Sequence, residues 1–124
     1  MKDRTSLSTP APVNVVHTDA LEWTEFEEAP GVTYKLLRRH EQDDGTTILI
    51  RFDAGSSYPA HRHPRGEEYY VLEGTLDDAR GQYGVGDHVY YPPGSAHRPR
   101  SRTGCTVLVF LPARVETLES TDTA

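Results

Sequence analysis

The chain has 124 residues, of which 35% are hydrophobic and 26% are charged, and its formal net charge is −6. This length and balance predict a single small globular domain, and the acidic charge without a long basic stretch argues against a nucleic-acid partner. One cysteine excludes an intramolecular disulfide, and no apolar run is long enough for a signal peptide or a bilayer span, so we expect no membrane partner and a cytoplasmic location.

The first part of the chain offers little apolar surface to bury. Residues 1–12 are rich in Ser, Thr and Pro and are predicted to form a flexible leader. Val13–His17 has the pattern of a short edge strand. In the next stretch Leu21, Trp23 and Phe26 lie among four glutamates, a spacing that fits either an irregular strand or one helical turn.

From Val32 onwards the sequence has the pattern of an all-β protein. Val32–Arg39 and Thr46–Asp53 are rich in strand-forming residues and flank a turn signal at Asp43–Gly45, which predicts a hairpin. Further short strands are expected at His61–His63, Glu67–Leu72, Thr75–Asp77, His88–Tyr91, His97–Ser101 and Cys105–Leu111. With no amphipathic helix, this rhythm predicts a double-sheet jelly roll over residues 13–112, followed by a flexible tail over residues 113–124.

The second strand of this hairpin has apolar residues on both faces. Ile48 and Ile50 share one face, while Leu49 and Arg51 share the other. A strand packed on both sides suits a closed barrel, and apolar residues on its outer face favour a homodimer. Arg51 would neutralise an anionic ligand if its face were the inner one; a surface position is the simpler interpretation. Cys105 alternates with valines in the last strand and is expected to be a buried small hydrophobe.

The run from Gly55 to Gly74 contains histidines and a carboxylate at intervals typical of a metal site. His61 and His63 are two residues apart, so in a strand their side chains point to the same face. The turn residues that follow allow a second strand, beginning at Glu67, to bring its carboxylate back beside the two imidazoles. A fourth candidate ligand, His97, follows the turn signal at Pro92–Gly94.

These positions resemble the two sequence motifs of the cupin family. The first motif has a glycine, a His-X-His pair, a glutamate and a second glycine at fixed intervals, which here are Gly55, His61, His63, Glu67 and Gly74. The second motif matches Gly86, Pro92, Gly94 and His97, but Ser101 stands where the family has asparagine. The resemblance implies the cupin fold, a double-stranded β-helix, which agrees with the jelly roll expected from the strand pattern.

The resemblance also implies one divalent metal ion held by His61, His63, Glu67 and His97. Glu68 is the competing carboxylate; we favour Glu67 because six residues then separate it from Gly74, as in the family. This ligand set suits Fe, Zn, Mn or Ni and does not choose among them. Because imidazole must be neutral to bind, we expect metal loss near or below the histidine pKa of ~6.5.

Within the family, the sequence around both motifs is similar to that of two groups. One is the zinc-binding cupin domain of anti-sigma factors, and the other is the dioxygenases that cleave small diketones and hydroxyacetophenones. Two functions are therefore expected. The first is a metal-dependent dioxygenase whose ion keeps open positions for a small anionic or carbonyl-bearing ligand. The alternative is a non-catalytic zinc-binding sensor or ligand-binding protein with a filled coordination sphere. A third hypothesis, a sugar epimerase of the same fold, has less support, because the pair of residues that would act as its general acid and general base is not evident in the sequence.

Overall fold

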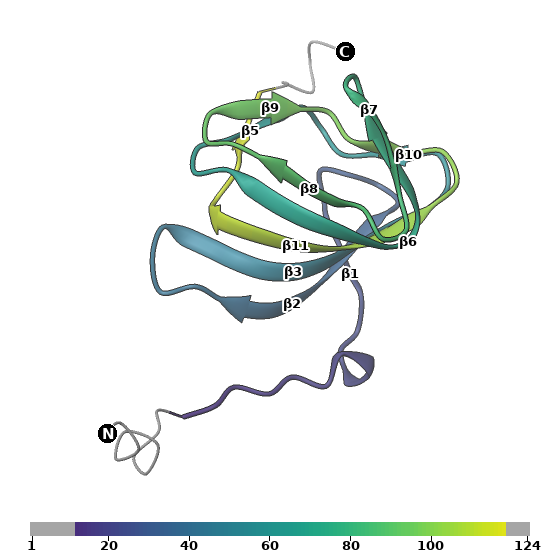
Figure 1. Cartoon of the computed structure of the whole chain (residues 1–124). Helices are drawn as coiled ribbons and strands as arrows, with labels where there is room; N and C mark the ends of the chain where they lie inside the picture. Colours follow the sequence, from purple (N-terminus) through teal and green to yellow (C-terminus); the bar gives the residue numbers. More distant parts are fainter. Residues whose placement is uncertain (1–11, 119–124) are drawn as a thin grey trace, which may run out of the picture.

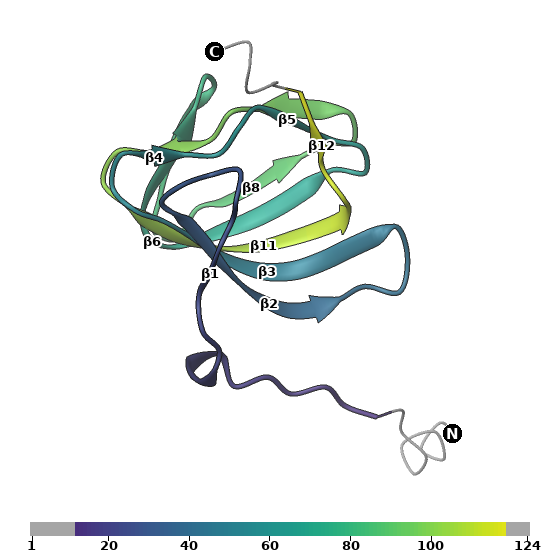
Figure 2. The ribbon, with the colours of Figure 1, turned by 180° about the vertical axis from the view of Figure 1, so that it is seen from behind.

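The computed structural model describes residues 12–118, and its strands form two facing sheets that curl into a barrel (Figures 1 and 2). The larger sheet has nine strands in the order β1-β2-β3-β11-β6-β10-β4, with β7 and β8 also paired to β6; the smaller has the order β12-β5-β9. The twelve strands are β1 (Thr24–Glu25), β2 (Val32–Arg39), β3 (Asp44–Phe52), β4 (Ser56–Ser57), β5 (His61–His63), β6 (Glu67–Asp78), β7 (Gly81–Gly84), β8 (His88–Tyr91), β9 (Ser95–His97), β10 (Arg100–Ser101), β11 (Cys105–Ala113) and β12 (Glu116–Thr117). The predicted all-β double-stranded β-helix in one domain is confirmed.

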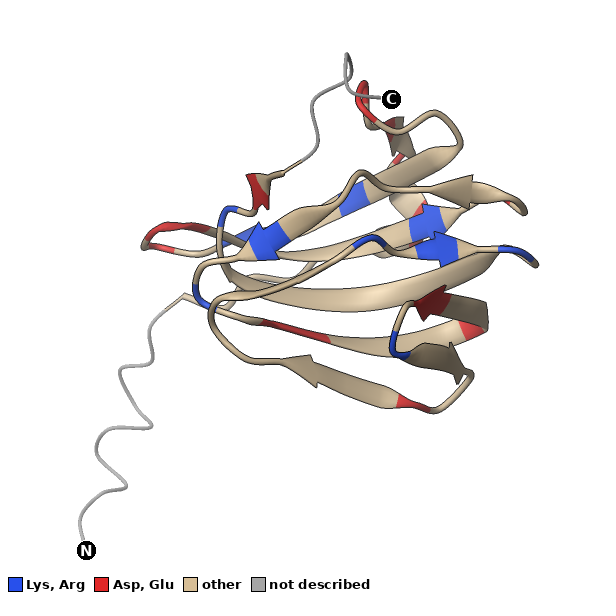
Figure 3. Ribbon diagram, turned by 90° about the horizontal axis from the view of Figure 1, so that it is seen from above, with Lys and Arg blue, Asp and Glu red and all other residues tan. Residues whose placement is uncertain are grey.

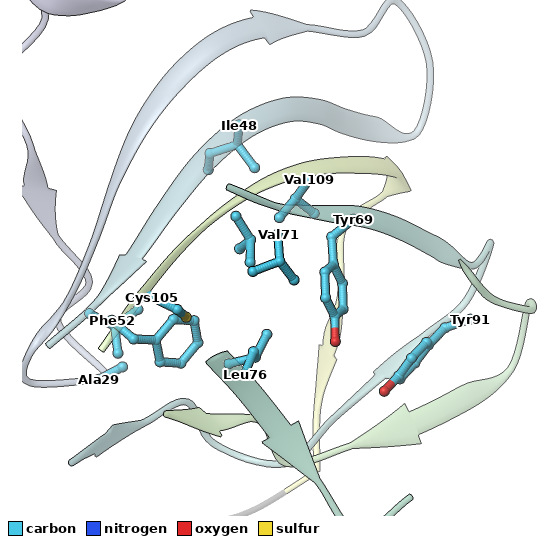
Figure 4. Close-up of a cluster of buried hydrophobic side chains, with 11 residues drawn as sticks. Ala29, Ile48, Phe52, Tyr69, Val71, Leu76, Tyr91, Cys105 and Val109 are labelled. Atoms are coloured by element: carbon cyan, nitrogen blue, oxygen red, sulfur yellow. The ribbon is translucent and has the colours of Figure 1, made fainter. Parts of the chain in front are cut away.

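The core fills the space between the sheets. Alternate residues of β3, β6 and β11 point inwards, as period-two strands require, and Cys105 packs among them (Figure 4). Figure 4 shows Phe52 and Cys105 together towards one end of the cluster, and Tyr69 and Tyr91 towards the other. Cys105 pairs in register with Phe52, and burial raises the pKa of its thiol to about 11, so it is the small hydrophobe that the sequence predicts.

A β-bulge in β2 changes which side chains face the core. Leu36 pairs with Ile48, but the register shifts between Leu36 and Arg38, so that Arg39 pairs with Thr46. Thr46 lies two residues before Ile48 and shares its inward face. Arg39 therefore points to the inside of the barrel, where uninterrupted alternation would have placed Arg38.

Several expected elements differ from the structure. Val13–His17 forms no strand; a short 3-10 turn at Thr18–Ala20 follows it. The two strands expected on either side of Gly74 are one continuous strand, β6, because Gly74 adopts a positive φ of 70° and lets the strand bend without ending.

The ends of the chain also differ from expectation. Residues 1–11 of the predicted leader and 119–124 of the predicted tail lie outside the described residues. Residues 113–118 were expected in the flexible tail, but β11 continues to Ala113 and β12 pairs with β5. The polar composition concealed this strand because Glu116 and Thr117 are exposed and contribute backbone hydrogen bonds rather than apolar burial. Within residues 12–118, no helix is long and apolar enough to cross a membrane.

Candidate metal centre

The four predicted ligands come from three strands, two in the smaller sheet and one in the larger sheet. His61 and His63 lie on β5, and β9 runs antiparallel beside it with His97 directly opposite His61. Residues paired in this way project to the same side, so the small sheet presents three imidazoles to the interior. Glu67 begins β6 and faces them from the larger sheet, where Glu67 pairs with Tyr91.

The turn between β5 and β6 depends on Gly66. Its φ is 87°, and a Cβ atom at this position would lie 2.8 Å from the backbone oxygen of Tyr91. Only glycine combines this left-handed conformation with so close an approach. The tight turn returns the chain quickly enough for Glu67 to reach His63, four residues earlier in the sequence.

The structure brings the four side chains together in a buried cluster. Their candidate ligand atoms all lie within 4.8 Å of one another. The Nε2 atoms of His63 and His97 lie 3.2 Å and 3.6 Å from Oε1 of Glu67. All four residues are buried, and the His63 side chain has no exposed surface.

Each imidazole is oriented by a contact that its Nδ1 atom makes on the side of the ring away from the cluster. The Nδ1–H group of His61 donates to the carbonyl of Pro59 at 2.8 Å, and that of His97 donates to Asp78 at 2.9 Å. Because a carbonyl or carboxylate only accepts, these bonds place the proton on Nδ1 and leave the Nε2 lone pair facing the cluster. Nδ1 of His63 contacts Oγ of Ser95 at 3.1 Å.

Burial keeps the imidazoles of His61 and His97 neutral. Desolvation lowers the pKa of His61, and it lowers the pKa of His97 to about 4 in spite of the nearby carboxylates. Burial on its own raises the pKa of Glu67, but the surrounding imidazoles, that of His63 first, outweigh it and hold this pKa below its usual value. At neutral pH the imidazoles of His61 and His97 are therefore neutral and Glu67 is a carboxylate, which is the protonation state that a metal ion needs in its ligands.

The arrangement passes a test of fit for a divalent cation. The buried Nε2 atoms of His63 and His97 have no hydrogen-bond partner among residues 12–118, and the contact of His63 with Glu67 does not have hydrogen-bond geometry. Buried polar atoms without partners are costly unless something else satisfies them. Ligand atoms bound ~2.1 Å from one ion lie roughly 3 to 4 Å apart, so small inward movements from the observed separations complete a site.

A cavity of about 260 Å³ opens beside the cluster inside the barrel. His61, Glu67 and His97 form part of its wall. Most of the remaining wall is apolar and comes from the inward faces of β3 and β11, while a few charged residues, Arg39 among them, lie at the end near the β2–β3 hairpin. A site that is dry on most sides and polar at the cluster suits a small organic ligand.

Other predicted residues lie outside the cluster. Glu68 points outwards and contacts the exposed His88 at 2.9 Å, which agrees with the choice of Glu67. Arg51 lies on the outer face, with its guanidinium 4.3 Å from the centre of the Trp23 ring, so it does not reach the cavity. Ser101, which replaces the family's asparagine, is fully buried and donates to the carbonyl of Thr75, so it supports the strand beside the site.

Sequence reasoning missed Asp78, which accepts hydrogen bonds from His97 and from the hydroxyl of Tyr91. Burial raises the pKa of Asp78, but these two hydrogen bonds outweigh it and lower the pKa, so the carboxylate stays ionised. In β6 the buried positions are odd-numbered from Glu67 to Val71 and even-numbered at Leu76, after the bend at Gly74. The change of parity at a strand glycine is the signal that could have placed Asp78 inside.

The fold and this buried cluster define a small cupin. A family model described as the ChrR cupin-like domain matches residues 12–114. Because this match covers most of the chain, the protein belongs to the ChrR-like cupin domain family.

Comparisons with individual proteins give the same fold. The chain is similar to an acetylacetone dioxygenase structure from Acinetobacter johnsonii, with a TM-score of 0.79 and 18% identity over 90% of this chain and 80% of the other. It is also similar to the structure of Rhodobacter sphaeroides SigE in complex with the anti-sigma ChrR, with a TM-score of 0.66 and 22% identity over 77% of this chain and 51% of the other.

Among curated proteins, the chain is 31% identical over 83 residues to the DNA damage-repair/toleration protein DRT102 of Arabidopsis thaliana; the match covers 62% of this chain and 26% of the relative. The chain spans about a quarter to a third of the length of the curated relatives that it matches.

Proposed function

We propose that the chain is a divalent-metal-dependent enzyme of the dioxygenase type, acting on a small diketone or hydroxyketone. The observation that carries this proposal is the position of the cluster: His61, Glu67 and His97 form one wall of an otherwise largely apolar cavity. A purely structural metal site has no need of a ligand-sized space beside it. The likeness in fold to an acetylacetone dioxygenase supports the same assignment.

In this proposal His61, His63, Glu67 and His97 hold the ion, which when bound would supply Lewis acidity and, for iron, redox chemistry with oxygen. The residues of the chain do the rest. Pro59, Ser95 and Asp78 fix the ring orientations from behind, so the ligand set is organised before an ion arrives. Three neutral imidazoles and one carboxylate leave a divalent site with a charge of about +1, which favours an enolate over the neutral ketone.

The apolar wall of the cavity favours this chemistry in a second way. Ile48, Ile50 and Val109 line the space and exclude water from the side of the substrate that faces away from the cluster. In such a dry site the attraction between a bound enolate and the cluster is stronger than it would be in water.

Metal analysis followed by oxygen-uptake assays tests the proposal. Protein purified without added metal is analysed for its metal content, then reconstituted with Fe(II) and supplied with a panel of 1,3-diketones and hydroxyketones. Oxygen consumption that requires both iron and a ketone, and that is lost in His61→Ala, supports the enzyme. An iron-loaded protein that consumes no oxygen with any of these ketones contradicts it.

A second function, a non-catalytic zinc-binding sensor, is favoured by the family match to the ChrR cupin-like domain. In this alternative zinc fills its coordination sphere with the four protein ligands and stabilises the barrel. Zinc as the metal of the purified protein, without oxygen uptake after iron loading, would support the sensor. Co-purification with a sigma factor would extend it to the partner seen in the ChrR complex.

We also propose a homodimer formed through the outer face of the larger sheet. Tyr70, Tyr90 and Phe110 are 41%, 58% and 42% exposed, and the register of β8, β6 and β11 places them close together on this face. A group of large exposed apolar side chains of this kind is commonly covered by a partner. Analytical ultracentrifugation should give a dimer for the native chain and a monomer for Phe110→Lys; a native monomer at high concentration would contradict the proposal.

A further inference from the structure

The end of the cavity near the β2–β3 hairpin differs from the rest of its wall because it is charged. Arg39, Asp44 and Arg114 line this end, whereas β3 and β11 contribute mainly aliphatic side chains further in. Figure 3 shows the basic end of β2 leading into the acidic hairpin loop at the edge of the molecule. A ligand inside the barrel would therefore meet the metal cluster on one wall and charged side chains at this mouth.

The bulge in β2 is what places an arginine at the mouth. Arg39 pairs with Thr46 on the inward face, whereas Arg38 points outwards and contacts Glu41 at 3.4 Å. Bulges commonly re-aim a side chain next to a functional site. Both arginines are exposed, but they lie on opposite faces of the strand, and Arg39 lines the mouth of the cavity while Arg38 does not.

Arg39 is also the arginine at this mouth that is not neutralised. Arg114 lies 3.6 Å from Asp44, so these two charges offset each other. Within residues 12–118 the side chain of Arg39 has neither an ion-pair nor a hydrogen-bond partner. Its five N–H donors remain available to an anion, and a guanidinium is well matched to a carboxylate.

The sheet register sets the spacing between Arg39 and the cluster. Arg39 pairs with Thr46 and Thr46 pairs with Leu111, while Phe110 pairs with Glu68 on β6. Leu111 therefore lies opposite Glu67. Arg39, Thr46, Leu111 and Glu67 thus form one row of paired residues across the sheet, and Arg39 is three strands away from Glu67. At ~4.8 Å per strand the two backbones are roughly 14 Å apart along the sheet, and both side chains reach inwards. The space between the guanidinium of Arg39 and the cluster suits a ligand whose apolar part is of medium length.

We propose that Arg39 determines substrate specificity by binding an anionic group, such as a carboxylate, at the end of the substrate away from the metal cluster. This inference rests on the proposed function, because the reacting end of the substrate is taken to lie at the cluster. The substrate class becomes a diketone or hydroxyketone that also carries a carboxylate: the diketone or hydroxyketone function lies at the cluster, an aliphatic body lies along β3 and β11, and the carboxylate lies on Arg39.

Calorimetric titration with octanoate and octanol tests this assignment without relying on catalysis. The two probes have the same apolar body of about eight carbons and differ in charge. Native protein is compared with Arg39→Gln and with Arg38→Gln, the matched control on the outer face of the same strand. The metal content of every sample is measured.

We expect Arg39→Gln to weaken octanoate binding by roughly five- to tenfold, the effect of one charge-assisted hydrogen-bonded pair at a partly exposed site, and to leave octanol binding unchanged. Arg38→Gln should bind both probes as the native protein does. Equal octanoate affinity in the native protein and Arg39→Gln, an equal loss in Arg38→Gln, or no binding of octanoate to the native protein would overturn the assignment.

The metal content separates this inference from the proposed function. Protein that holds metal but shows no selective octanoate loss in Arg39→Gln overturns the role of Arg39 alone. Protein that holds no metal but still shows the selective loss supports Arg39 as the anion-binding residue and counts against the metal site.

Discussion

Glu67 and Glu68 are neighbours in the sequence with opposite surroundings in the fold. Glu67 is 8% exposed and faces three imidazoles, while Glu68 is on the outer face with His88. Because strand residues alternate between faces, one position decides whether a carboxylate can bind a metal ion. This contrast gives a matched pair of substitutions.

Glu67→Gln is expected to lower divalent-metal affinity by at least about a hundredfold, since it removes the charged ligand while keeping the shape of the side chain. Glu68→Gln should leave the affinity unchanged. Competition titration against a chromophoric chelator measures both variants. Equal affinities for the two variants would contradict the ligand assignment.

Asp78 acts on the metal site through His97. Asp78→Asn replaces the carboxylate that accepts the Nδ1–H bond with a neutral amide, so the ring is held less firmly and its Nε2 becomes a weaker donor to a metal. We expect metal affinity to fall about tenfold, with the barrel still folded by circular dichroism. Asp77→Asn is the control, because Asp77 is the adjacent residue and lies near Arg102. An equal loss of metal affinity in Asp77→Asn would contradict a specific role of Asp78.

The sequence predicts the four clustered residues but not the groups around them. His61, His63 and Glu67 could be predicted because one short strand and one tight turn connect them to the start of the next strand. Asp78 and Arg39 could not, because each follows a break in alternation, at Gly74 and at the β2 bulge respectively. Such breaks depend on how neighbouring strands pair across the sheet, which local sequence does not determine.

At the scale of elements, the β5–β6 turn fixes the distance between the histidines and the carboxylate. Gly66 and Gly55 both adopt a φ of 87°, but only Gly66 has a backbone atom close to where a Cβ would lie. Alanine substitutions at these two glycines therefore separate two contributions to the free energy of unfolding, that of the left-handed conformation and that of a steric clash.

Gly55→Ala is expected to lower the free energy of unfolding by about 1 kcal/mol, the cost of placing alanine at a positive φ. Gly66→Ala should cost roughly 2 kcal/mol or more, because its Cβ also meets the carbonyl of Tyr91, and it should weaken metal binding by displacing Glu67. Urea unfolding and metal titration measure the two effects. Equal destabilisation of both variants would show that the close approach has no energetic consequence.

The element order was predictable where strands are rich in strand-forming residues, as in β2, β3 and β11. It was not predictable at the ends. Val13 and Val15 suggested a strand, but both are exposed and nothing in the described chain pairs with them. β12 forms from polar residues because the edge of β5 is available to it, and Arg62 on that edge lies 3.3 Å from Glu116.

At the scale of the whole molecule, stability should depend on pH through the buried histidines. In the unfolded chain histidine binds a proton near pH 6.5, but in the folded chain burial lowers the pKa of His97 to about 4. Between these values the unfolded state binds more protons, so acid favours unfolding. The contribution is fully present above pH 6.5 and is lost as the pH falls towards 4.

For metal-free protein, we expect the free energy of unfolding to fall by on the order of a few kcal/mol between pH 6.5 and pH 4, and less steeply in His97→Gln. Denaturant titrations across this range measure the effect. Bound metal should persist at pH 6 and dissociate in the same acidic window, somewhat lower than free histidine would suggest. A stability that stays constant between pH 7 and pH 4.5 would contradict the neutral, buried state of His97.

The pairing of His61 with His97 also has a consequence for the order of events during folding. The first three candidate ligands lie within seven consecutive positions, from His61 to Glu67, but the fourth arrives only when β9 docks against β5, which closes a long loop. Pairings between distant segments form late and slowly. A nascent chain would therefore hold an ion only loosely with the segment from His61 to Glu67, and firm retention of the metal would report that β9 has docked against β5.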